Sequence, residues 1–272
     1  MRAEGARQVS IEAPRKEERL LDPAISLTGV GKVFATRRGE VTALRELTLE
    51  ARRSEALGVV GPSGCGKSTL LELACGLQEP TSGTVAVEGA TGAAERLRSC
   101  VLMPQRDLLL PWRSALDNAA LALELRKIGR AEARRRALAL FERFAIEEFA
   151  RARPDELSGG MRQRVSFART LLAEKPILLL DEPFGSLDSI TRAELQEWLA
   201  GALSEEPRTT LLVTHDVEEA LFLCDRVLIL SPRPGTVRSE IRVDLDRSRA
   251  RREQVTSPEF GALKERALEA LA

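Results

Sequence analysis

Apolar residues in this chain form several short, uninterrupted runs with amphipathic stretches between them. The runs occupy residues 56–60, 177–180, 209–214 and 226–230. Uninterrupted runs of this length are typical of strands that are buried on both faces of a parallel sheet. Because helical patterns separate the runs, the sequence predicts βαβ units and an α/β fold with a parallel-sheet core.

Weaker patterns in the rest of the chain predict how its domains are organised. Residues 1–23 mix charges with alanine and proline, and we interpret them as a mobile tail. Residues 24–245 form the predicted domain, in which a helical subdomain occupies about 106–158. Residues 246–272 are charged at first and end in a weak helical pattern, which predicts a C-terminal helical tail.

A glycine-rich segment lies between the first apolar run and a helical pattern. Its residues are Gly61, Pro62, Ser63, Gly64, Cys65, Gly66, Lys67, Ser68 and Thr69, hereafter the phosphate loop. The spacing G-x-x-x-x-G-K-[ST] between a strand and a helix predicts a nucleotide phosphate site rather than an ordinary glycine-rich turn. Glycines let backbone N–H groups approach phosphate oxygens, Lys67 supplies a charge for them, and the Ser68 hydroxyl can bind Mg²⁺. Cys65 is interpreted as a small loop residue, although a thiol beside a helix N-terminus can be reactive.

Polar side chains follow three of the predicted strands at the points where these strands end. Asp181 and Glu182 follow one buried run, His215 follows another, and Gln105 follows a short strand at 101–103. In open α/β sheets, ligands bind beyond the carboxyl ends of the strands. We therefore expect Asp181 to hold Mg²⁺ and Glu182 to polarise a water, with His215 near a phosphate or near Glu182. Gln105 is a weaker candidate for binding Mg²⁺ or orienting water.

A second helix start in the chain has the features of an anion-binding site. Ser158 is a good N-cap, and Gly159 and Gly160 leave backbone N–H groups exposed. The phosphate loop already provides one such site, so the spare helix start indicates that two copies of the chain share two nucleotides, head to tail. The alternative is an ordinary helix start that happens to contain glycine.

Composition and charge exclude several classes of protein. Lysine plus arginine and aspartate plus glutamate both count 41 in 272 residues, so there is no electrostatic footprint for nucleic acid. The four cysteines form no C-x-x-C pair, which argues against a zinc cluster. No apolar run approaches the roughly 18 residues of a membrane span. These observations predict a protein that is soluble, or peripheral to a membrane through partners.

Together these motifs resemble the ATP-binding subunit of an ABC transporter over about residues 25–235. The resemblance implies a P-loop NTPase (RecA-like) parallel-sheet core with an antiparallel β subdomain and a helical subdomain. It also implies ATP and Mg²⁺ as cofactors and a homodimer, with each ATP lying between one copy's phosphate loop and the other copy's 158–160 segment.

The same resemblance implies a role for each candidate residue. Glu182 would be the catalytic base, Asp181 a Mg²⁺ ligand, and His215 a contact of the γ-phosphate. Gln105 would link Mg²⁺ to the transport partner, and residues 186–188 would communicate across the dimer. Phe34 matches the position at which the family stacks an aromatic ring on adenine, whereas its spacing alone favours a core residue.

A narrower resemblance, to nitrate, sulfonate and taurine importers, rests on residues 110–113, 117–119 and 230–235 and on Met161. It implies an ATP-hydrolysing subunit for uptake of a small anion or sulfonate-like solute, docked on a separate permease at the cytoplasmic face of the cell membrane. A solute-binding protein would be an indirect partner. The apolar stretch 108–112 is our candidate for the docking groove, with a core hairpin as the alternative.

Three other functions share some of these sequence features. An ABC importer ATPase for another small solute, such as a pyrimidine precursor, would have the same motifs. A P-loop small-molecule kinase would need an acceptor pocket and would have no use for the 158–160 segment. ABC proteins that act on DNA or ribosomes typically carry two ATP sites or a coiled-coil insert, and this chain has neither.

Overall fold

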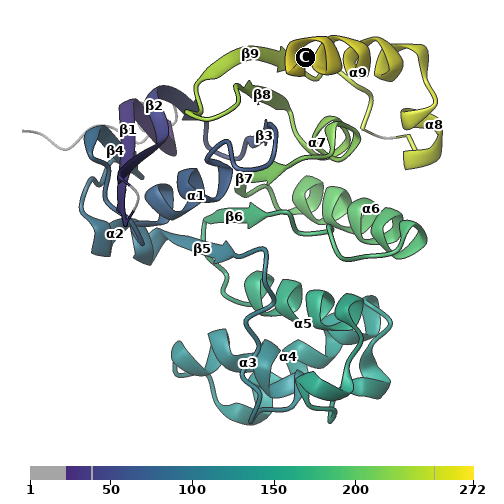
Figure 1. Cartoon of the computed structure of the whole chain (residues 1–272). Coiled ribbons are helices and arrows are strands. Elements are labelled where there is room, and N and C mark those ends of the chain that lie inside the picture. The colour runs from purple at the N-terminus through teal and green to yellow at the C-terminus, as the bar shows by residue number, and fades with distance from the viewer. Residues whose placement is uncertain (1–22, 38, 248) are drawn as a thin grey trace, which may run out of the picture.

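The computed structural model describes residues 23–37, 39–247 and 249–272. Its main sheet has six strands in the order β5-β6-β7-β3-β8-β9 (Figure 1). These strands are β3 (Ala56–Val60), β5 (Cys100–Met103), β6 (Ile177–Asp181), β7 (Thr209–Thr214), β8 (Arg226–Leu230) and β9 (Val237–Arg242). The first five pair in parallel, and β9 adds an antiparallel edge beside β8. All residues of β3, β6 and β7 are buried, so the α/β fold with a parallel core is confirmed.

A second, antiparallel sheet lies at the left of the view in Figure 1. Its order is β2-β1-β4, formed by β1 (Ile25–Thr36), β2 (Gly39–Ala51) and β4 (Ser82–Val87). The buried residues of this sheet join one apolar core with β3 and with helix α1 (Lys67–Cys75). The antiparallel sheet therefore packs against the element that begins at the phosphate loop. Helix α2 (Ala93–Ser99) follows β4, and the sequence pattern did not predict it.

Three helices form a group at the bottom of Figure 1. They are α3 (Ala115–Leu125), α4 (Arg130–Arg143) and α5 (Gly159–Leu171), with short 3-10 turns at Glu147–Phe149 and Pro154–Glu156. An aromatic cluster connects this group to the main sheet. The ring centre of Phe167 in α5 lies 5.8 Å from that of Phe184, which follows β6, and the ring centres of Phe144 and Trp198 are 4.9 Å apart. Ring pairs at such distances add directional contacts to the burial of apolar area.

The last helices of the chain lie to the right of the main sheet in Figure 1, across the sheet from α1. Two of them leave the strand ends, namely α6 (Ser189–Glu205) and α7 (Val217–Leu223). The chain then ends in α8 (Arg251–Val255) and α9 (Pro258–Leu271), which lie beside α7 at the upper right of Figure 1. The sequence predicted only a weak terminal helix, yet Phe260 and Ala267 of α9 are fully buried. In the described part of the chain, no helix is long and apolar enough to cross a membrane. The predicted tail 1–23 lies outside the described residues, apart from Pro23.

Candidate functional site

The phosphate loop joins β3 to α1 and is shaped by its glycines. Gly66 is the N-cap of α1 with φ of 108°, a left-handed conformation that favours glycine. A Cβ at this position would also lie 2.7 Å from the Leu44 side chain. Lys67 is almost fully buried, and its Nζ donates to the carbonyl oxygens of Gly61 at 2.8 Å and of Pro62 at 3.1 Å. The loop therefore curls around the ammonium group of Lys67 at the start of the helix.

Cys65 lies inside this loop and is 1% exposed. Burial raises the pKa of its thiol, and the charge of Lys67 only partly opposes that effect. Because the thiolate is the reactive form of cysteine, both the raised pKa and the burial of this thiol disfavour its reaction. Burial therefore favours the interpretation of Cys65 as a small packing residue of the loop over that of a reactive thiol.

Oxygen ligands meet at the carboxyl end of β6. Asp181 is 7% exposed, and burial raises the pKa of its carboxyl. Interactions with the side chain of Ser68, the second residue of α1, and with the charge of Lys67 lower that pKa. A carboxylate beside a hydroxyl is a donor set that suits Mg²⁺, which normally keeps waters and phosphate oxygens as its other ligands. Within residues 23–37, 39–247 and 249–272, no three His, Cys, Asp or Glu side chains could hold a metal by themselves.

Glu182 is held from two neighbouring strand ends. Its Oε2 accepts a hydrogen bond of 2.9 Å from Gln105 Nε2, beyond β5, and its Oε1 lies 3.2 Å from His215 Nδ1, beyond β7. The backbone of Glu182 has φ of 47°, in the left-handed region that non-glycine residues rarely adopt. Such strain persists where the surroundings fix a residue tightly and is concentrated at functional sites. The structure thus brings together the three side chains for which the sequence predicted catalytic roles.

A cavity of about 320 Å³ connects Gln105 and Glu182 to the phosphate loop. The residues that line it are Phe34, Val41, Ala43, Ser63, Gly64, Gly66, Lys67, Ser68, Thr69, Gln105, Glu182 and Arg233. Phe34 is partly exposed on the wall of the cavity, with Lys32 Nζ 5.0 Å from its ring centre. The interpretation of Phe34 as a core residue, drawn from spacing alone, is therefore wrong. Sequence reasoning missed Arg233 because its place in the cavity depends on the turn between β8 and β9, far from the other lining residues in sequence.

The 158–160 segment does not line this cavity. Ser158 is the N-cap of α5, where its Oγ accepts a hydrogen bond of 3.2 Å from the Met161 N–H. Ser158 and Gly159 are exposed, so this helix start faces outward from the chain. Arg162 on the same helix donates to Asp107 Oδ2 at 3.0 Å and to Leu157 O at 2.7 Å, which ties the helix start to the segment after Gln105. In one copy of the chain, the two segments for which the sequence predicts phosphate binding therefore lie at separate places.

Comparison with known proteins adds evidence that is independent of this geometry. The family model for the ABC transporter matches residues 44–185. The nitrate import ATP-binding protein NrtD of Synechococcus elongatus is 42% identical over 245 residues, 89% of each chain. The aliphatic sulfonates import ATP-binding protein SsuB 1 of Rhodococcus jostii is 45% identical over 230 residues, 84% of this chain and 89% of its own length. The taurine import ATP-binding protein TauB of Pseudomonas aeruginosa is 40% identical over 255 residues, 92% of this chain and 95% of its own.

Solved structures show the same similarity. One is the ATP-binding cassette MJ0796 as a dimer in a post-hydrolysis state, bound to ADP and Pi. It superposes with a TM-score of 0.75 at 30% identity, covering 80% of this chain and 98% of the other. A second dimeric structure of that bacterial cassette has the same TM-score at 32% identity.

Proposed function

Because the chain belongs to the ABC transporter family, we propose that it is the ATP-hydrolysing subunit of an importer for a small anion or sulfonate-like solute. The relatives named for nitrate, taurine and aliphatic sulfonate import support this solute class. An importer of another small solute, such as a pyrimidine precursor, is the second candidate within the same family.

The observation that carries the proposal is the position of Glu182 at the cavity of the phosphate loop, between Gln105 and His215. The phosphate loop and Lys67 bind the phosphates of ATP, and Phe34 stacks on the adenine. Glu182 accepts a proton from the attacking water as the catalytic base, and His215 contacts the γ-phosphate. Ser68, Asp181 and Gln105 would hold Mg²⁺, which neutralises phosphate charge when it is bound.

The second half of each site comes from another copy of the chain. Ser158 and Gly159 are exposed and Gly160 is half-buried at the start of α5, and all three lie outside the cavity of their own chain. In the proposed homodimer, this helix start binds the γ-phosphate of the ATP held by the partner copy. The two dimeric structures of the cassette MJ0796 support this arrangement. ATP then favours the closed dimer, and hydrolysis removes the contacts that hold it closed.

Coupling to transport requires a surface for the permease. Leu108 and Trp112 are 61% and 69% exposed in the segment that follows Gln105. Large apolar side chains exposed together mark an interaction surface, so we assign the segment 108–112 to docking rather than to a core hairpin. The chain would then bind peripherally at the cytoplasmic face of the membrane, with a solute-binding protein as an indirect partner.

The test is the variant Glu182→Gln, which keeps the shape of the side chain and removes its basicity. We expect ATP binding to persist, phosphate release to stop, and ATP to trap a dimer that light scattering detects. Steady phosphate release at the wild-type rate would contradict the role of Glu182 as the base. Transfer of phosphate to a small acceptor, rather than its release, would favour the small-molecule kinase.

A further inference from the structure

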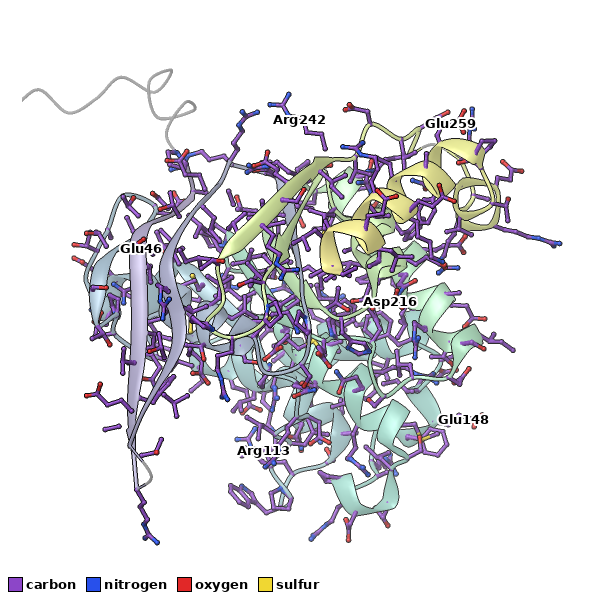
Figure 2. The ribbon with its side chains drawn as sticks, turned by 45° about the horizontal axis from the view of Figure 1, so that its top comes forward. Glu46, Arg113, Glu148, Asp216, Arg242 and Glu259 are labelled. Atoms are coloured by element: carbon purple, nitrogen blue, oxygen red, sulfur yellow. The ribbon has the colours of Figure 1, made fainter. Side chains whose placement is uncertain are left out.

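Helices α6 and α7 leave the candidate site side by side, and each begins beside a segment for which the sequence predicts a role in ATP hydrolysis. Asp188 is the N-cap of α6 and the last residue of the turn 186–188, which we expect to communicate across the dimer. Asp216, labelled in Figure 2, is the N-cap of α7 and directly follows His215. Its Oδ1 accepts hydrogen bonds from the N–H groups of Glu218 at 2.9 Å and Glu219 at 3.3 Å. A shift of α7 against α6 would therefore move His215 relative to that turn.

Polar side chains define how α6 and α7 fit together. Gln196 of α6 donates to Glu219 Oε2 of α7 at 3.4 Å, and both residues are at least nine-tenths buried. Nearer the site, Arg192 of α6 lies 3.9 Å from Asp216 and donates to Leu187 O at 3.0 Å. A buried polar pair is satisfied in only one register of two helices, whereas an apolar interface tolerates sliding.

The C-terminal segment reaches this interface through one arginine. Arg251 of α8 donates from Nε to Gln196 Oε1 at 3.1 Å and from Nη2 to Glu218 Oε1 at 2.9 Å. Its backbone N–H donates to Glu197 Oε1 at 3.0 Å, and its guanidinium lies 5.4 Å from the ring centre of Phe222. A planar guanidinium with donors in several directions can bridge two helices, which a lysine ammonium does poorly. Arg251 thus contacts α6 and α7 at the same time.

We propose that Arg251 is a positioning residue for ATP hydrolysis, which holds α7, and with it His215, in register with α6 and the turn 186–188. His215 Nδ1 lies 3.2 Å from Glu182 Oε1, so this contact is sensitive to small displacements. A misplacement of about 1 Å in an active site can cost on the order of 100-fold in rate. The proposal rests on the ATPase activity of the chain and gives a function to a segment outside residues 44–185, which the family model matches.

The test compares Arg251→Met with Arg252→Met in the full chain. Arg252 is the next residue of α8 and is exposed, so its replacement is a matched control for the loss of a charge from the same helix. We expect kcat for ATP to fall roughly tenfold in Arg251→Met, the effect of about 1.4 kcal/mol on the barrier. KM for ATP should change less than about twofold, because the phosphate loop is untouched, and Arg252→Met should match the wild type.

Two further variants separate positioning from a merely structural role. Gln196→Met removes the acceptor on α6, and its loss in kcat should be non-additive with that of Arg251→Met, since both break one bridge. Arg251→Lys keeps the positive charge but lacks the planar guanidinium with donors in several directions. Its kcat should therefore lie between those of Arg251→Met and the wild type.

The results that would overturn the proposal are equally specific. A folded Arg251→Met variant with wild-type kcat would overturn it, and so would losses that add fully with those of Gln196→Met. Should Arg251→Met fail to fold, a wild-type kcat in Arg251→Lys would overturn it instead. A wild-type chain without ATPase activity would contradict the proposed function itself, so the two failures are distinguishable.

Discussion

Replacement of Glu219 by glutamine tests whether the protonation of this buried side chain, at the interface between α6 and α7, makes the stability of the protein depend on pH. The Glu219 side chain is 3% exposed, and its Oε1 has no hydrogen-bond partner. Burial, with a further contribution from the charge of Asp216, raises the pKa of Glu219 from 4.5 to about 8. The folded protein therefore keeps a proton on Glu219 at neutral pH, whereas the unfolded chain has lost it.

The sign of the pH dependence follows from this difference. Between pH 4.5 and about 8 the folded state binds one proton more than the unfolded state, so the free energy of unfolding falls as pH rises. At 1.36 kcal/mol for each unit of pH, the wild type should lose about 3 kcal/mol from this group between pH 6 and pH 8.5. The variant Glu219→Gln has no titrating group at position 219, so this part of the loss in unfolding free energy should be absent from it.

The assay is urea unfolding at pH 6, 7 and 8.5, followed by tryptophan fluorescence. Trp198 is a suitable probe because it packs against Phe144 and Phe167 in the core. Glu194→Gln, an exposed glutamate of α6, is the matched control and should behave as the wild type. Wild-type and Glu219→Gln unfolding free energies that change in parallel with pH would refute the reasoning.

Three other predictions follow from the site and its surroundings. Phe34→Ala should raise the Kd for ATP by roughly tenfold or more, as expected for the loss of about 1–3 kcal/mol of base stacking. Phe34→Trp should restore the affinity. Equal Kd values in titrations of the wild type and the two variants would contradict stacking. Cys65 should resist iodoacetamide at pH 8 in the folded protein and react after unfolding, and rapid labelling of the native thiol in a mass spectrum would contradict its burial. Trp112→Ala should leave the ATPase rate of the isolated chain unchanged and reduce its co-purification with the permease, whereas unchanged co-purification would argue against docking at 108–112.

The parts of the fold that sequence predicted well are those that depend on local pattern. The apolar run 56–60 became β3 with every residue buried, and Asp181 ends β6 with Glu182 directly after it, as expected. These features can be predicted from the sequence because a strand buried on both faces needs continuous apolar residues, and because the carboxyl ends of parallel strands meet at one edge of the sheet. The phosphate loop was equally clear because its glycines and Lys67 follow a fixed spacing.

The features that sequence missed depend on contacts between distant segments. Arg233 joins the cavity and Arg251 bridges two helices only after the chain has folded, and neither has a local pattern around it. The position of Phe34 was misjudged from spacing for the same reason, because alternation along a strand does not reveal which neighbour covers a ring. The antiparallel edge strand β9 was missed because exposed residues alternate in it with buried or half-buried ones, without the continuous apolar run of the inner strands.

The measurement that tests the central claim most directly is the ATPase rate per chain as a function of protein concentration, with the oligomeric state followed by light scattering. In the proposed dimer, each complete site takes the phosphate loop from one copy and Ser158 to Gly160 from the other. We predict that the rate per chain rises with concentration and reaches a plateau as the ATP-bound dimer forms. A rate per chain that stays at its plateau value in solutions that contain only monomer would contradict it.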